Sequence, residues 1–140
     1  MLKIIKQLMI YFLAVTICDA SIGDMPMKLL QSRATFYKVT VTAYTNHSSC
    51  GEGNPNITAS SVPIKPHLYK RLIALSGDLA KKYDYGDQFK LWVKNKLYSV
   101  TFLDRMSKRH RKHVDLLLPS LKKCRQFGRK MGVLVPMEQS

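Results

Sequence analysis

From residue 36 onward, the sequence is divided into short β-type segments that are separated by turn residues. Segment 36–45 alternates and is rich in β-branched and aromatic residues, which is typical of a strand. Gly86 and Asp87 precede a similar segment at 88–93, and residues 94–96 connect it to 97–103, so we expect a hairpin there. The same criteria predict further strands at 57–60, 72–75, 114–118 and 133–135.

Helical signals are few in this chain. Asp78 to Tyr83 predicts a single helical turn, and Ser120 is a suitable N-cap for a helix over 121–130, with Gly132 expected to end it. Six or more short strands with one or two short helices predict a mainly β fold, a small barrel. The 140 residues are enough for one domain of ordinary size.

The N-terminus has the pattern of a secretory signal peptide. Lys3 and Lys6 precede an apolar stretch of 11 residues, 8–18, and small residues follow at Ala20 and Ser21. We therefore predict a signal peptide at 1–20, an N-terminal tether at 21–35 and the barrel domain at 36–136. A buried N-terminal helix is the alternative interpretation. No apolar run reaches the roughly 18 residues of a membrane span, which excludes a multi-pass membrane protein.

Cys18 raises the question of lipidation, which would make it the acylated first residue of the mature chain. A lipobox needs a small residue immediately before the cysteine, and this chain has Ile17 there. The sequence therefore favours an exported protein that is periplasmic, associated with the outer membrane or secreted.

The predicted mature chain is strongly basic. Removal of residues 1–20 takes away two lysines and one aspartate, which leaves 21 basic and 8 acidic residues and a net charge of +13. This charge suits an anionic partner, such as an anionic envelope surface. Export and the lack of a basic strand interleaved with aromatic residues argue against nucleic acid.

Two cysteines, Cys50 and Cys124, remain after the signal peptide. In an exported protein they permit one disulfide, although two free thiols are an equal alternative from sequence. His110 and His113 lie in a charged segment whose cations disfavour a metal ion, and no zinc-binding motif occurs, so no metal and no cofactor are predicted.

Two of the eight carboxylates stand in apolar surroundings. Asp104 follows Val100 to Leu103, and Asp115 is flanked by Val114 and three leucines. Burial of a carboxylate raises its pKa, as a general acid near neutral pH requires. The alternative is a structural salt bridge with the basic segment 108–113, whose charge would lower the pKa instead.

Several blocks, in the same order, resemble the 3D domain, a family named for three aspartates. The resemblance extends from about residue 39 to 135 and rests on the blocks Val41–Thr45, Cys50–Gly51, Thr58–Ser60, Ile73–Asp78, Tyr85–Asp87, Asp104–Arg109, His113–Leu116 and Arg125–Lys130. It implies a six-stranded double-psi β-barrel related to membrane-bound lytic transglycosylase A. The chain departs from the family at Ser61, where a glycine is usual, and at Arg105-Met106, where many members have Gly-Gly.

The resemblance also implies roles for individual residues. Asp115 would be the single acid and base, Asp104 its neighbour in the cleft, and Asp78 the third aspartate of the family. The positions that would line the sugar groove are Tyr44, Thr45, Thr58 and Ser60.

The activity implied is cleavage of the β-1,4 bond between N-acetylmuramic acid and N-acetylglucosamine in peptidoglycan during cell-wall turnover. The expected partner is the peptidoglycan glycan strand, and the expected state is a monomer. The alternative function is that of a non-catalytic, exported barrel that binds peptidoglycan without cutting it.

Overall fold

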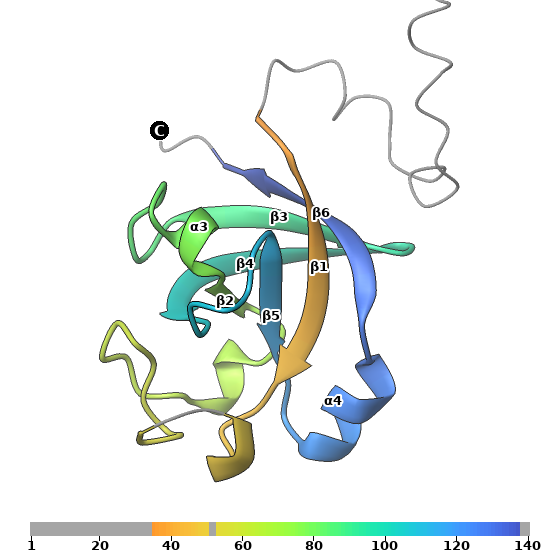
Figure 1. Cartoon of the computed structure of the whole chain (residues 1–140). Coiled ribbons are helices and arrows are strands. Elements are labelled where there is room, and N and C mark those ends of the chain that lie inside the picture. Colours follow the sequence, from red (N-terminus) through yellow and green to blue (C-terminus); the bar gives the residue numbers. More distant parts are fainter. Residues whose placement is uncertain (1–34, 51–52, 138–140) are drawn as a thin grey trace, which may run out of the picture.

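A computed structural model describes residues 35–50 and 53–137 of the chain. Its six strands close into a barrel in the order β1-β5-β2-β4-β3-β6 (Figure 1). The predicted signal peptide and almost all of the tether lie outside the described residues. The predicted fold class, a mainly β six-stranded barrel, is confirmed. The strands are β1 (Tyr37–Tyr44), β2 (Leu72–Leu75), β3 (Gln88–Val93), β4 (Lys96–Arg105), β5 (His113–Leu117) and β6 (Lys130–Pro136).

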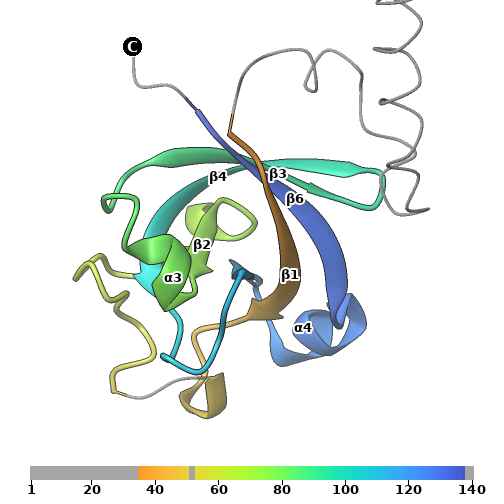
Figure 2. The same ribbon diagram turned by 45° about the horizontal axis from the view of Figure 1, so that its top comes forward.

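Two pairs of neighbouring strands run parallel, β1 with β5 and β2 with β4, and the other neighbours run antiparallel. The predicted hairpin is present between β3 and β4, where Val93 pairs with Lys96. Its two-residue connection places Lys94 at a φ of 51°, in the left-handed region. Figure 2 shows the strands as a ring, with the two short helices on different sides of it.

Alternating side chains fill the interior of the barrel. Val39 and Val41 from β1, Phe89 and Leu91 from β3, and Phe102 from β4 are fully buried there. All four residues of β2 are buried, as expected for a strand that is covered on both faces. Burial of each large apolar side chain contributes about 1.5–3 kcal/mol to stability.

The prediction of a strand at 57–60 is wrong. Ile57 makes only an isolated bridge to Pro63, and a tight turn lies between them. The hydroxyl of Thr58 accepts a hydrogen bond from the Val62 backbone N–H at 3.0 Å, and Ser61 has a φ of 66°. Side-chain capping of the turn replaces the ladder that a strand would need.

The helices are shorter than predicted. The turn expected at 78–83 is α3 (Gly77–Ala80), and the helix expected to run to 130 is α4 (Leu121–Phe127). Ser120 caps α4 as predicted, by accepting a hydrogen bond from the Lys123 N–H, but Gly128 ends it at a φ of 64°. No helix in the described part of the chain combines the length and the apolar character that a membrane span requires.

Gly132, which was expected to end that helix, lies within β6 instead. A β-carbon at this position would lie 2.8 Å from the Trp92 carbonyl oxygen and 2.8 Å from a methyl group of Val41. The glycine therefore allows β6 to pack closely against both of its neighbouring strands, β1 and β3.

Candidate functional site

A row of four residues crosses four adjacent strands of the barrel. Thr42 of β1 pairs with Asp115 of β5, and Asp115 pairs with Ala74 of β2. On its other side, Ala74 pairs with Asp104 of β4. Residues paired in this way point to the same face of a sheet, so both aspartates share a face and are separated by two strand spacings, about 10 Å between Cα atoms.

A β-bulge in β4 brings Asp104 into this row. Ile73 pairs with Phe102, but the next residue, Ala74, pairs with Asp104, so Leu103 is the extra residue. Without the bulge, Ala74 would face Leu103 and Asp104 would point to the opposite face of the sheet. The bulge is therefore what places the second carboxylate beside the first.

Three residues of this row, Ala74, Asp104 and Asp115, line an open cleft of about 800 Å³. Its walls come from the segment after β1, the segment before β2 and the loop after β4, and the first two lie together below the barrel in Figures 1 and 2. Both aspartates and three of the four predicted groove residues, Tyr44, Thr45 and Thr58, line the cleft. Ser60 does not line it, and its hydroxyl is 2.9 Å from that of Thr58.

Asp104 is held by three donors. The Tyr44 hydroxyl donates to Oδ2, and the backbone N–H groups of Ala59 and Arg105 donate to Oδ1, each at 2.9 Å. Burial, followed by the charge of Asp104, raises the pKa of the Tyr44 hydroxyl far above its usual value, so this group remains a donor. Asp104 is therefore an immobile acceptor that fixes a negative charge in the cleft.

Asp115 is in a different environment. Burial raises its pKa from 3.8 to about 6, and the charge of Asp104 adds to the increase, while a hydrogen bond from Thr42 opposes it. That hydrogen bond joins Thr42 Oγ1 to Oδ1 at 2.9 Å. The basic segment 108–113, whose charge could have lowered this pKa, is not among the causes of the shift. The resulting pair, one fixed carboxylate and one that can hold a proton near pH 6, can perform acid–base chemistry.

Asp78 is not part of this pair. It lies in α3, outside the cleft lining, and accepts hydrogen bonds from the Ser76 hydroxyl at 2.6 Å and from the Lys112 N–H at 3.0 Å. Burial acts to raise its pKa, but these and other hydrogen bonds outweigh it and lower the pKa below 3.8. The structure therefore brings two of the three predicted aspartates together and places the third behind the start of β5.

Cys50 and Cys124, for which both a disulfide and free thiols were open, are free thiols in this structure. Cys50 lines the cleft. Burial, with further contributions from Cys50 and Asp115, raises the pKa of the Cys124 thiol to about 11, so this group is protonated at neutral pH. Because Cys50 and Asp115 both line the cleft and both act on the Cys124 thiol, α4 lies close to the cleft.

The sequence analysis missed several cleft residues. Met106, Arg109 and His110 line the cleft from the loop after β4. Thr42, which does not line the cleft but donates to Asp115, was not predicted either. Its place in the alternation of β1, next to the buried Val41, could have indicated that it faces away from the core.

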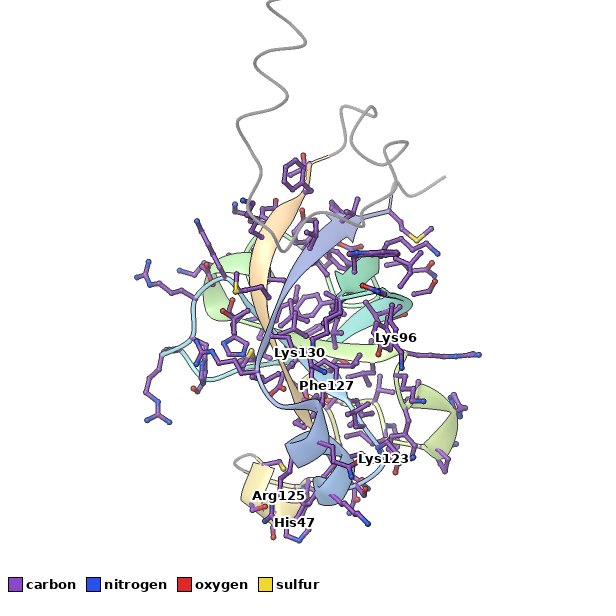
Figure 3. All side chains as sticks on the ribbon, turned by 90° about the vertical axis from the view of Figure 1, so that its right-hand side faces the viewer. His47, Lys96, Lys123, Arg125, Phe127 and Lys130 are labelled. Atoms are coloured by element: carbon purple, nitrogen blue, oxygen red, sulfur yellow. The ribbon has the colours of Figure 1, made fainter. Side chains whose placement is uncertain are left out.

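A second charged region lies beside α4, and we call it the basic face. Its members are Lys94, Lys96, Lys123, Arg125 and Lys130, of which Figure 3 labels all but Lys94. The Lys130 ammonium lies 4.1 Å from the centre of the Phe127 ring. Burial, then repulsion from Lys94 and Lys96, lowers the pKa of Lys130. Positive charge is thus concentrated on this side of the barrel (Figure 3).

Comparisons with known proteins find matches among solved structures only. No protein-family model and no curated protein matches the chain. The expansin of Clavibacter michiganensis has a similar fold, with TM-scores of 0.53 for the apo crystal structure (18% identity) and 0.52 for a mutant in complex with cellohexaose (17% identity). Each match covers 76% of this chain and 52% of the expansin, so the chain spans about half the length of that protein.

MltA from E. coli is also among the matching structures, with a TM-score of 0.46, 14% identity and coverage of 64% of this chain and 29% of MltA. The expansin match shows that the two proteins share a barrel fold of the double-psi type.

Proposed function

We propose that this barrel cleaves glycan strands of peptidoglycan at the β-1,4 bond of N-acetylmuramic acid, as a lytic transglycosylase, with Asp115 as its acid and base. The observation that carries the proposal is the placement of Asp115 in an open cleft with a pKa of about 6, beside the fixed charge of Asp104. At pH 6 half of the molecules would hold the catalytic proton. At the usual pKa of 3.8 fewer than about 1% would.

The proposed reaction needs only one titrating carboxyl. Protonated Asp115 donates its proton to the glycosidic oxygen while the bond between that oxygen and the anomeric carbon breaks. Positive charge develops at the anomeric carbon, and the next sugar leaves with a free hydroxyl group. The Asp115 carboxylate then accepts the proton of the muramyl C6 hydroxyl, whose oxygen bonds to the anomeric carbon and closes a 1,6-anhydro ring. Asp104, held by its three donors, favours both the proton on Asp115 and the positive transition state.

The charge distribution supports a glycan that carries carboxylates. Arg109 and His110 stand on the cleft wall, and the basic face begins beside α4. An uncharged polysaccharide would gain nothing from the charges of Arg109 and the basic face, whereas the stem peptides of peptidoglycan would be attracted to them. The proposed substrate therefore lies in the cleft with its peptides toward the cationic loop and the basic face, in the envelope of the cell.

Digestion of purified sacculi tests the proposal. We expect the protein to release muropeptides with 1,6-anhydro ends, detected by mass spectrometry. Asp115→Asn should lower the rate by about 10² to 10⁴, the usual contribution of a general acid. Asp84→Asn, at an exposed position, is the matched control and should cleave normally. Undiminished cleavage by Asp115→Asn would remove this residue from the proposed role.

The second candidate function is glycan binding without cleavage. It is favoured by the crystal structure of a mutant of the expansin in complex with cellohexaose, because that protein shares this fold and binds an oligosaccharide. Under this function, the protein would sediment with sacculi and release no fragment. The same digestion therefore separates the two functions in one experiment.

A further inference from the structure

Thr42 links Asp115 to a buried histidine. Its Oγ1 lies 2.9 Å from Asp115 Oδ1 and 2.8 Å from His113 Nε2. A hydroxyl has one proton, so it can donate to only one of these two atoms and must accept from the other or lose that hydrogen bond. When Asp115 is ionised it can only accept, so Thr42 donates to Asp115 and His113 must carry its proton on Nε2.

The surroundings of His113 keep the imidazole neutral and fixed. Burial, then the charges of His110 and Arg129, lowers its pKa, and its side chain is 4% exposed. The His110 ring packs edge-on against it at 4.9 Å. A neutral imidazole with its proton on Nε2 is a good donor to Thr42 and cannot accept from it at that atom.

The backbone of His113 is fixed by the third aspartate. The His113 N–H donates to Ser76 Oγ at 3.0 Å, and Ser76 donates to Asp78 at 2.6 Å. Asp78 also accepts from the N–H of Lys112, which has a φ of 43°. This contact holds a backbone conformation that is unfavourable for lysine directly before β5. Asp78 thus fixes the position of His113 from outside the cleft.

We propose that His113, acting through Thr42, is a positioning residue that forces the acidic proton of Asp115 onto Oδ2. Because Thr42 is committed to donating to Oδ1, that oxygen cannot easily carry the proton. Oδ2, the oxygen that Thr42 does not bind, must then carry it and deliver it. The charged and titratable groups around these hydrogen bonds are His110, Lys112 and Arg129 beside His113, Asp78 behind it, and Asp104, Tyr44 and Cys124 around Asp115. The role in delivery rests on the proposed function, whereas the hydrogen-bond order does not.

NMR of the full chain tests the hydrogen-bond order without any substrate. We expect His113 to be the Nε2–H tautomer at pH 7.5 in a ¹⁵N spectrum of the imidazoles. We expect Thr42→Val to raise the pKa of Asp115, followed by ¹³C of its carboxyl, by about one unit, because it removes a hydrogen bond to the charged form. Thr42→Ser should restore the normal value. His113→Phe should also raise it, and His113→Gln, which keeps a neutral N–H donor, should not.

An Nδ1–H tautomer, or an Asp115 titration that is the same in Thr42→Val and His113→Phe as in the wild type, would overturn the proposal. Thermal unfolding of each variant identifies any that fail to fold, and the tautomer of the unmodified protein remains decisive if they do. On sacculi, the alkaline limb of the pH–rate profile should move upward in Thr42→Val and return in Thr42→Ser. If the wild type does not cleave sacculi but the tautomer and the Asp115 titrations are as expected, the proposed function is refuted and the hydrogen-bond order stands.

Discussion

Replacement of Asp115 by asparagine should make the protein more stable at neutral pH and leave it almost unchanged at pH 4. Below about pH 3.8 the aspartate is protonated in the native and the unfolded states. Between pH 3.8 and about 6 only the unfolded state releases the proton, so the wild type loses stability as the pH rises. Above pH 6 both states are ionised and the full cost of the buried charge is present. A shift from 3.8 to about 6 corresponds to about 3 kcal/mol.

Asparagine has nearly the same shape, carries no charge and can still accept the hydrogen bond from Thr42. We therefore expect the difference in unfolding free energy between the variant and the wild type to grow by up to about 3 kcal/mol from pH 4 to pH 8. In a barrel of this size, this corresponds to a rise in Tm on the order of 10 °C at pH 8. Urea unfolding at several pH values measures it, with Asp84→Asn as the control that should show no such trend. A difference that stays constant within about 0.5 kcal/mol would refute the raised pKa.

Three further outcomes are expected. Gly132→Ala should destabilise the barrel by about 3 kcal/mol in thermal unfolding, because the added β-carbon would lie 2.8 Å from a strand carbonyl oxygen. Gly77→Ala, which has open space around it, is the control and should not destabilise the barrel. Equal effects of the two substitutions would contradict the close packing of β6. The double variant Lys96→Glu, Lys130→Glu should sediment less with sacculi than the wild type at 50 mM salt and about equally at 500 mM salt. Equal sedimentation of the variant and the wild type at 50 mM salt would exclude the basic face as a contact. Tyr44→Phe should lower the free energy of unfolding by about 1–2 kcal/mol and slow any cleavage, because Asp104 loses one of its three donors. Full activity of this variant would show that the two backbone donors are enough.

Much of the barrel could be predicted from the sequence because its strands carry local signals. The alternation in β1 and β3 and the four apolar residues of β2 each correspond to the burial seen in the structure. The hairpin between β3 and β4 could be predicted because both of its strands are adjacent in sequence. Local patterns succeed where the strand and its partner are determined by nearby residues.

The errors occur where a competing local interaction decides the conformation. Residues 57–60 have strand-like composition, yet the Thr58 hydroxyl bonds to the Val62 N–H and favours a turn. Leu121 to Lys130 has helical character throughout, yet Gly128 adopts a positive φ and starts the turn into β6. Both outcomes depend on backbone dihedral angles that composition alone does not specify.

The candidate site depends on pairings that no local pattern contains. Asp104 and Asp115 were singled out because they interrupt apolar segments, but their meeting requires β2 to lie between β4 and β5, parallel to one and antiparallel to the other. It also requires the bulge at Leu103, since an unbroken strand would turn Asp104 toward the other face. Ala74 then separates the two carboxylates with a single methyl group, and this small side chain leaves the space between them open to the cleft. On a regular β4 the two aspartates would not share a face, and a large residue at position 74 would fill the space between them. The chemistry proposed for this chain therefore follows from its strand order, from one extra residue and from one small side chain.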